Sequence, residues 1–389
     1  MADDLSSDDR AFVDELRTWL SEHLVGEFKA AGPVGGLTDI SHWDLRRAWE
    51  RELAAGRWLN IAWPVEYGGR GGTIRQELLF HLEHAAWGAP YWVGVQGRDL
   101  FGPTLLEHGT AEQKARFLPR ITSVTDIWGQ GFSEPDAGSD LAGMKTRGEL
   151  DGDEWVITGQ KIWMTFGGNA DWMYVLCRTD PASERHRGIS MLLIDAKAPG
   201  IEVRPIRTMA GHSEFAEVFF DGARTAADLV VGEPGQAWAI VMATLGNERG
   251  GTTTIPYQES FKREMQMLLF LSRERGINTD RVVRDRLMRF WIRLRLMELN
   301  NLRLQSAAMN GKLPGPESSI GKLVWANWHR DFGELMMDLR GVDAIASTGD
   351  LGDDPMVHSF LNSRAETIYG GANEIQRNIL GERVLGLPK

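Results

Sequence analysis

The segment "GFSEPDAGSDLAGMKT", residues 131–146, combines hydroxyl groups, glycines and acids in a short stretch. Ser133, Gly138, Ser139 and Gly143 supply hydroxyls and accessible backbone N–H groups, which can bind an anion or the edge of a ring. The same composition is ordinary for a surface turn, because Pro, Asp, Gly and Ser are common turn formers. The segment alone therefore leaves a ligand-binding loop and a surface turn equally open.

A glycine pair near the end of the chain is the second candidate. In "TIYGGANEIQR", Gly370 and Gly371 follow Tyr369 and precede an amphipathic pattern in which Ile375 and Ile379 lie one helical turn apart. Two adjacent glycines allow a tight turn and let a ligand come close to the main chain. We expect a backbone hinge that opens a helix.

Several common catalytic patterns are absent from the sequence. "FHLEHAAWG" offers His81, Glu83 and His84, but this spacing does not match helical zinc sites, and a structural or solvated role is expected. There is no HExxH, CxxC, P-loop or GxSxG pattern. The sequence therefore gives no support for a metal site, a dithiol site, a P-loop nucleotide site or a serine hydrolase.

A cluster of arginines surrounds an apolar stripe in residues 281–297. Arginines can hold phosphate. Here they flank an apolar stripe whose spacing indicates one buried helix face, formed by Val283, Leu287, Phe290, Leu294 and Met297. A solvated or salt-bridged surface is the better interpretation of the cluster, which consists of Arg281, Arg284, Arg286, Arg289, Arg293 and Arg295.

The type of secondary structure that the sequence predicts changes twice along the chain, from helix to strand and back to helix. Residues 1–125 show helical periodicity, with Phe12, Leu16 and Leu20 on one face of the first helix. Residues 126–235 contain short runs rich in β-branched and aromatic residues, which predict a small barrel or sandwich. Residues 236–389 return to longer helical patterns. This order does not alternate strand and helix, which disfavours a doubly wound sheet.

The length, charge and cysteine content of the chain indicate which kind of protein it is and in which compartment it works. A chain of 389 residues with a formal net charge of -11 lacks the basic footprint of a nucleic-acid binder. Cys177 is the only cysteine, so no disulfide can form within the chain. The first residues are acidic where a signal peptide would be basic, and no apolar run approaches the ~20 residues of a membrane span. We expect a soluble cytoplasmic protein.

Several segments together resemble the acyl-CoA dehydrogenase family over nearly the whole chain. They are "WPVEYGG", the segment of residues 131–146, "VITGQKIWMTFGGNADWMYVLCR", "TIYGGANEIQR" and "GERVLGLP", in this order. The resemblance implies an α+β multi-domain fold. An N-terminal helical domain is followed by a central β-barrel or sandwich domain and a C-terminal four-helix-bundle domain.

The resemblance also implies a chemistry and a cofactor. Family members bind FAD and oxidise a coenzyme A thioester to its α,β-unsaturated product, while a carboxylate removes the α-proton. By motif position, Ser139, Arg249 and Gly371 are expected to contact the substrate. The expected FAD contacts are Gln130, Phe132, Ser133, Gly138, Ser139, Trp163, Met164, Thr165, Ala372 and Glu374.

The position of the catalytic base is unusual. Many family members place a glutamate directly after the tyrosine of the last motif, where this chain has Gly370. The isovaleryl and long-chain types carry it on an earlier helix instead, and the matching residue here is Glu248, directly before Arg249. A surface glutamate is the competing interpretation of Glu248. Glu374 is a poorer candidate, because its position matches a cofactor contact.

Two departures from the family pattern leave alternatives open. The chain lacks the RxxFG segment that contacts FAD of a neighbouring subunit, and Gly341 is followed by Val342 where many members have a further glycine. A homo-oligomer (tetramer or dimer) and a heteromer with a related chain are both expected possibilities, with an electron-transfer flavoprotein as acceptor. A non-catalytic subunit, or a flavin oxidase or monooxygenase on the same fold, is the alternative function. The acyl group is not predicted.

Overall fold

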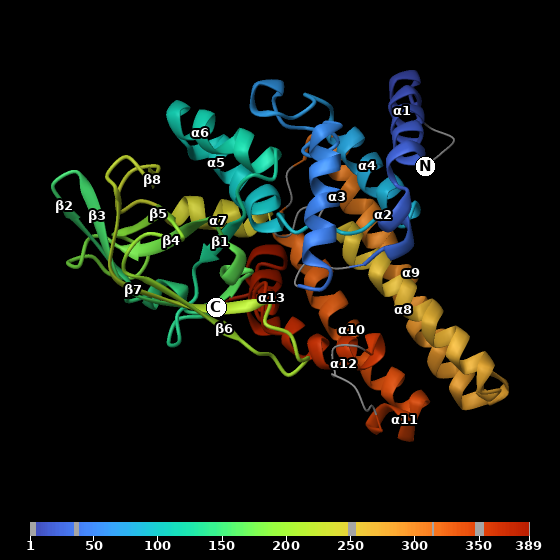
Figure 1. Ribbon diagram of the computed structural model, residues 1–389. Coiled ribbons are helices and arrows are strands. Elements are labelled where there is room, and N and C mark those ends of the chain that lie inside the picture. Colours follow the sequence, from blue (N-terminus) through green and yellow to red (C-terminus); the bar gives the residue numbers. More distant parts are fainter. Residues whose placement is uncertain (1–4, 35–38, 248–253, 313–314, 347–353, 389) are drawn as a thin grey trace. The chain divides into compact units, whose positions relative to one another are not determined.

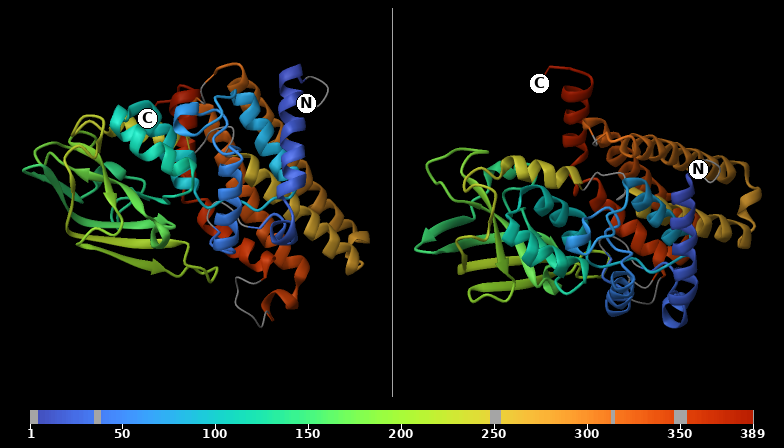
Figure 2. Two further views of the ribbon diagram at one scale, coloured as in Figure 1. Left: turned by 45° about the horizontal axis from the view of Figure 1, so that its top comes forward. Right: turned by 90° about the horizontal axis from the view of Figure 1, so that it is seen from above.

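The computed structural model describes residues 5–34, 39–247, 254–312, 315–346 and 354–388. The chain forms two compact units: unit 1 covers Met1–Arg207 and Ser213–Glu248, and unit 2 covers Thr208–His212 and Arg249–Lys389. The N-terminal helices and the sheet fall within one unit, and the domain boundaries near residues 125 and 235 stay predictions. Figures 1 and 2 show the elements, and the two units are described separately.

Unit 1 begins with helices, and side chains cap the N-termini of three of them. Thr73 and Thr110 form capping boxes with Gln76 and Gln113, and Ser6 accepts a hydrogen bond from the Asp9 N–H group. These helices are α1 (Ser7–His23), α2 (Gly26–Ala31), α3 (Trp43–Ala55), α4 (Ile74–Ala86), α5 (Gly102–His108) and α6 (Ala111–Thr122), with a 3-10 turn at Val65–Tyr67 and a π-helix, η3, at Gln96–Phe101.

The predicted apolar face of the first helix is confirmed. Phe12, Leu16 and Leu20 of α1 are buried in a cluster with the indoles of Trp49 and Trp58. Burial of large aromatic side chains supplies most of the hydrophobic stabilisation of such a helical layer.

The central part of unit 1 is one mixed sheet. Its order is β6-β7-β3-β2-β4-β5-β8, and β1 pairs with β4 in parallel. The strands are β1 (Trp128–Gly131), β2 (Arg147–Asp151), β3 (Glu154–Thr165), β4 (Trp172–Arg178), β5 (Ile189–Asp195), β6 (Ile201–Ile206), β7 (Phe215–Ala226) and β8 (Val230–Val231). The runs "EWVITG", "WMYVLCRTD", "GISMLLID", "GIEVRPI" and "AEVFFDG", rich in β-branched and aromatic residues, are confirmed as strands, β3 to β7.

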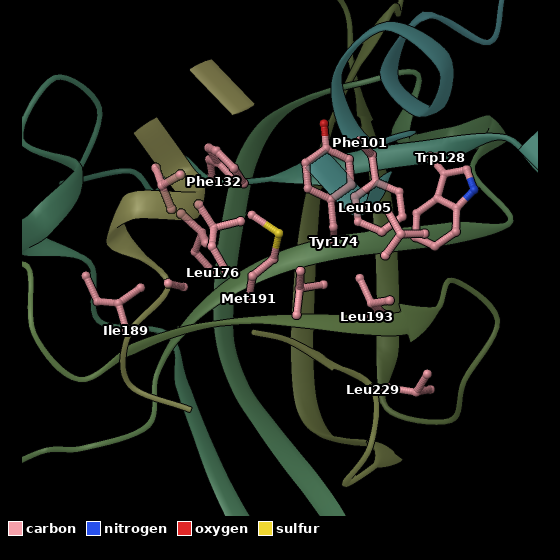
Figure 3. Close-up of a cluster of buried hydrophobic side chains, with 14 of the residues drawn as sticks. Phe101, Leu105, Trp128, Phe132, Tyr174, Leu176, Ile189, Met191, Leu193 and Leu229 are labelled. Carbon is pink, nitrogen blue, oxygen red and sulfur yellow. The ribbon is translucent and has the colours of Figure 1, made fainter. Parts of the chain in front are cut away.

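Both faces of the sheet are buried, which explains the continuous apolar runs in β4 and β5. Tyr174 and Leu176 of β4 lie in one core, and Met173 and Val175 lie in another. The first core also contains side chains of α5, α6 and α7 (Trp238–Asn247), and Figure 3 shows part of it. Helices therefore cover one face of the sheet within unit 1.

Unit 2 is built around long helices that pack together through aromatic side chains. The rings of Trp328 and Phe332 stack with centroids 4.6 Å apart, in a cluster that includes Leu287, Leu294 and Met297 of the predicted stripe. The main helices are α8 (Thr254–Glu274), α9 (Arg281–Met309), α10 (Ser319–Arg340) and α12 (Pro355–Glu366), followed by α13 (Asn373–Ile379) and a π-helix, η9, at Leu380–Val384; the short α11 spans Val342–Ile345.

The predicted fold class is confirmed: helices, then a sheet domain, then a helical bundle. Among the described residues, none of the helices combines the length and the apolar character that crossing a bilayer requires.

Candidate active site

The segment of residues 131–146 starts where β1 ends and lies beside β3. The N–H group of Ile162 donates to the carbonyl of Ser133 at 2.9 Å. Glu134 and Ala137 exchange two backbone hydrogen bonds of 3.0 Å, which close a tight turn. Ser133 is therefore held next to the stretch of β3 that carries Trp163, and the structure brings two of the predicted cofactor-binding segments together.

Two of the predicted cofactor residues use their side chains for packing. Phe132 is 6% exposed, and its ring meets that of Tyr174 edge-on with the centroids 5.7 Å apart. Figure 3 draws both side chains in the same buried cluster. Met164 is fully buried in the core on the other face of the sheet. Only the backbone of these two residues remains available to a ligand, a distinction that the sequence did not predict.

Other predicted residues have free polar groups. Within the part of the chain that the structure describes, the hydroxyls of Ser133, Ser139 and Thr165 make no hydrogen bond. The Nε2 atom of Gln130 is shielded from solvent and also lacks a partner among the described residues. Gly138 has open space where a side chain would start. Buried polar groups are normally paired, so the shielded Gln130 Nε2 atom fits a polar ligand, to which the partly or fully exposed hydroxyls could also bind.

Trp163 has the most unusual conformation in this region. Its φ of +61° is left-handed, and its side chain is 55% exposed. The pairing of β3 with β7 shifts register between Lys161 and Met164, so a bulge turns the indole outward. A left-handed backbone costs about 1–2 kcal/mol for a residue with a side chain. Such strain concentrates at functional sites, and an exposed indole there suits a flat ligand.

The glycine pair of unit 2 forms a closed loop before α13. Gly370 and Gly371 have φ values of +63° and +87°, which favour glycine. The side-chain amide of Gln376 donates to both of their carbonyl groups, at 3.1 and 3.2 Å. The N–H group of Asn373 donates to the carbonyl of Thr367 at 3.0 Å. The predicted hinge is thus a defined loop, held by a side chain of the helix that follows.

The two other predicted residues of this region lie at the start of α13. Ala372 is the residue that precedes the helix, and it has an extended ψ of 153°. Glu374 is exposed in the first turn and forms an ion pair with Arg377 at 3.1 Å. An exposed carboxylate that is paired with an arginine is poorly placed to act as a general base.

A buried charged cluster anchors the other end of the loop. His329 of α10 contacts Glu366 Oε2 through Nδ1 at 2.6 Å and Glu264 Oε2 through Nε2 at 2.8 Å. Lys322 Nζ donates to the carbonyl of Glu366 at 2.7 Å. Burial lowers the pKa of His329, but the two carboxylates outweigh it and raise the pKa to about 10. The last residue of α12 is thereby fixed directly before the loop.

Glu248 and Arg249, the predicted base and the predicted substrate arginine, lie outside the described residues. The described helix α7 ends at Asn247, one position earlier. It is fixed within unit 1, because Thr244 Oγ1 lies 2.9 Å from Thr104 Oγ1 of α5. Ile240 and Val241 of α7 are buried in the core shared with the sheet.

The sequence analysis missed a buried ion pair between Lys161 and Glu134, whose atoms Nζ and Oε1 are 2.8 Å apart. A signal for it was present. Trp155 and Ile157 alternate along β3 as inward-facing residues, and the same two-residue period places Lys161 on the buried side. A lysine at an inward position needs a buried partner.

Comparison with known proteins agrees with this architecture. Three family models match in order: the acyl-CoA dehydrogenase N-terminal domain at residues 6–125, the middle domain at residues 129–223 and the C-terminal domain at residues 235–385. This chain belongs to the acyl-CoA dehydrogenase family. The predicted enzyme class, an acyl-CoA dehydrogenase that acts as an oxidoreductase, is confirmed.

Two relatives cover nearly all of the chain. A protein of Mycolicibacterium smegmatis named acyl-CoA dehydrogenase IpdE1 is 45% identical over 390 residues, 97% of each chain. Its namesake in Mycobacterium tuberculosis is 46% identical over 382 residues, again 97% of each chain.

Solved structures show the same fold. One titled Tcur3481-Tcur3483 steroid ACAD has a TM-score of 0.82 and 28% identity, covering 99% of both chains. The ChsE4-ChsE5 complex from Mycobacterium tuberculosis has a TM-score of 0.79 and 29% identity, with the same coverage.

Proposed function

We propose that this protein is an FAD-dependent dehydrogenase that converts an acyl-CoA thioester to its α,β-enoyl-CoA, with Glu248 as the base. The observation that carries the proposal is the full ordered set of family motifs with Gly370 in place of an acid. A carboxylate must remove the α-proton, and Glu248 is the acid at the family's other base position. The test is reduction of an artificial electron acceptor by purified protein with an acyl-CoA, with the enoyl-CoA product identified by mass.

The residues of this chain have separate tasks in the proposal. Glu248 takes the α-proton, and the loop of Gly370 and Gly371 leaves room for the thioester to approach the backbone. Trp163 covers one side of the cofactor site and excludes water. FAD, when bound, supplies a hydride acceptor at its N5 atom.

The polar groups of unit 1 support FAD as the cofactor. The unpaired hydroxyls of Ser133, Ser139 and Thr165, with the unpaired Gln130 Nε2, match the donors and acceptors of a flavin ring and its phosphates. The open space at Gly138 allows close approach to the backbone there. From unit 2, Ala372 and Glu374 remain the predicted contacts.

Replacing Trp163 with alanine is expected to weaken FAD binding by about tenfold or more while changing the free energy of unfolding by less than about 1 kcal/mol. The indole is 55% exposed and its ring centroid lies 6.0 Å from that of Phe215, so its loss should cost a ligand more than it costs the fold. Flavin fluorescence titration and thermal unfolding check both parts. Trp87→Ala removes another exposed indole of unit 1 and should leave FAD affinity unchanged; an equal loss in both variants would contradict the assigned role.

A ring-bearing acyl group is the substrate class we propose. Support comes from the structural relative that is named a steroid ACAD. The sequence around Glu248 adds Gly246, Gly250 and Gly251, which carry no side-chain bulk. The test is a panel of acyl-CoAs with straight, branched and fused-ring acyl groups. Highest kcat/KM on a straight chain would reject this substrate class and leave the dehydrogenase proposal intact.

Association with a second, related chain is part of the proposal. Helix α9 has an apolar stripe opposite its buried side, formed by Met288, Ile292, Leu296 and Leu299, all exposed. Exposed apolar stripes on long helices mark protein interfaces. Two structural relatives have titles that name two chains. The altered family segments noted in the sequence also favour a heteromer.

Introducing glutamate at both Leu296 and Leu299 is expected to weaken the assembly by about 30-fold or more, because two charges would be desolvated in an apolar interface. Light scattering after size exclusion measures the assembly, and circular dichroism verifies the helices. Phe270→Glu, at an exposed apolar residue of α8 outside this stripe, serves as the control in unit 2. An unchanged assembly would place the interface elsewhere.

The second candidate function is a partner-dependent, non-catalytic subunit, favoured by Gly370. Under that hypothesis the chain purified alone lacks FAD and acquires it only with a partner. One FAD for each chain of a lone homo-oligomer would reject it. The leading proposal also includes an electron-transfer flavoprotein as the electron acceptor and a cytoplasmic location. If air instead reoxidised the reduced flavin rapidly and formed peroxide, the protein would be an oxidase.

A further inference from the structure

The ion pair between Lys161 and Glu134 is the most completely buried pair of opposite charges on the sheet. Lys161 has no exposed surface and Glu134 is 7% exposed. Although burial raises the pKa of Glu134, Lys161 and the neighbouring hydrogen-bond donors hold this pKa below its ordinary value. The other titratable group near the pair is Cys177, whose pKa burial raises to about 12, so it stays neutral.

The side-chain hydrogen bonds of the pair all fasten the segment of residues 131–146. Lys161 Nζ donates to the carbonyl of Phe132 at 3.1 Å, where the segment begins. Glu134 Oε2 accepts from the N–H group of Lys145 at 2.6 Å, and Oε1 accepts from that of Thr146 at 2.9 Å, where the segment ends. Two side chains therefore join both ends of the segment that carries Ser133, Gly138 and Ser139.

Lys161 is the last residue of β3 before the bulge. Lys161 is paired with Val218 of β7, and the register shift that turns Trp163 outward begins directly after it. Ile162, between them, donates to the carbonyl of Ser133. The ion pair thus lies where the two predicted cofactor-binding segments meet.

A buried ion pair is a costly way to gain stability alone. Taking both charges out of water costs several kcal/mol for each ion, and apolar replacements of similar volume are often as stable. What an apolar pair cannot do is bind one carbonyl and two N–H groups at fixed positions. The geometry of the hydrogen bonds is therefore what this pair contributes.

We propose that Lys161 and Glu134 are positioning residues that set the backbone of Phe132 and Ser133 relative to that of Trp163, and so determine cofactor affinity. This proposal rests on the proposed function, because it assigns the cofactor to these segments. Neither residue touches the reacting atoms. Their effect passes through the backbone groups that they hold.

The test is the double variant Lys161→Met/Glu134→Gln, which removes both charges and leaves no unpaired ion to unfold the protein. We expect FAD to bind about tenfold more weakly or worse, with an altered visible flavin spectrum, since small misplacements of binding groups are costly. Amide hydrogen exchange in residues 132–146 should become faster in the cofactor-free protein. The melting temperature should stay within a few degrees of wild type.

A matched control exists in the same segment. Lys145 and Asp136 form an ion pair of 3.2 Å whose side chains are 75% and 79% exposed. The variant Lys145→Met/Asp136→Asn removes the same charges from the surface and should change neither FAD affinity nor hydrogen exchange, because exposed pairs contribute little.

The outcomes separate the two proposals. Unchanged hydrogen exchange in the double variant, or faster exchange with FAD affinity within twofold of wild type, would overturn the positioning role. A wild-type protein that binds no FAD, with its partner present, would overturn the proposed function instead. The hydrogen-exchange comparison would then still decide whether the pair holds the segment.

Discussion

Glu248→Gln is expected to lower kcat by about 10²–10⁴-fold, the usual contribution of a positioned general base. Glutamine has nearly the same shape but cannot accept the α-proton. Stopped-flow reduction of bound flavin by the acyl-CoA substrate measures the affected step directly. FAD content and substrate affinity should remain close to wild type, which would separate loss of the base from loss of the site.

The control for Glu248→Gln is Glu233→Gln, which neutralises an exposed acid shortly before α7. It should reduce flavin at the wild-type rate. Full-rate reduction by Glu248→Gln would contradict the assignment of Glu248 and return attention to an acid supplied by a partner chain. Arg249→Ala should act differently, with a raised KM as its main effect, because its predicted contact is with the substrate.

His329→Leu is expected to destabilise unit 2 by about 3–5 kcal/mol, the cost of removing one partner from a buried charged cluster. Glu264 and Glu366 would lose the cation between them, to which both now bind at 2.8 and 2.6 Å. Denaturant unfolding followed by circular dichroism measures the loss. His23→Gln, on a partly exposed histidine of unit 1, should change the free energy of unfolding little.

The same cluster predicts a pH dependence. The pKa of His329 is raised from 6.5 to about 10, so the folded state holds this proton more tightly than the unfolded state. The stabilisation is complete below about pH 6.5 and is lost as the pH rises through about 10. Wild-type stability should fall over this range more than that of His329→Leu. Parallel curves would show that the histidine is not charged in the folded protein.

The sequence predicted the parts of the fold that follow a simple period. β4 and β5 were recognisable because both of their faces are buried, which requires continuous apolar runs. β1 was not, since two of its four residues are glycine, and the polar β2 exposes most of its residues. Their pairing depends on the rest of the sheet rather than on their own composition.

The candidate site was predicted as segments but not as side-chain orientations. Trp163 and Met164 are neighbours in sequence, yet one is exposed and the other fully buried. A bulge decides this difference, and its position depends on the pairing with β7. No local pattern in the strand reveals where such a shift occurs.

On α9 the prediction was right for the charges and incomplete for the apolar residues. Arg286, Arg289 and Arg293 pair with Asp338, Asp285 and Asp331, as expected for a salt-bridged face. The buried stripe is also confirmed. The second, exposed stripe was missed because a period identifies an apolar face without saying whether this chain covers it.

The contact between Thr104 and Thr244 has a consequence for how this enzyme can be tuned. It anchors α7 to α5, and α7 is the described helix that leads directly to position 248. A base after Tyr369 would take its position from the glycine loop of unit 2, whereas the base that we propose at position 248 follows directly on a helix of unit 1. We therefore expect natural variation at Thr104, far along the chain from every family motif of the site, to alter the rate of proton removal while leaving the motifs themselves identical.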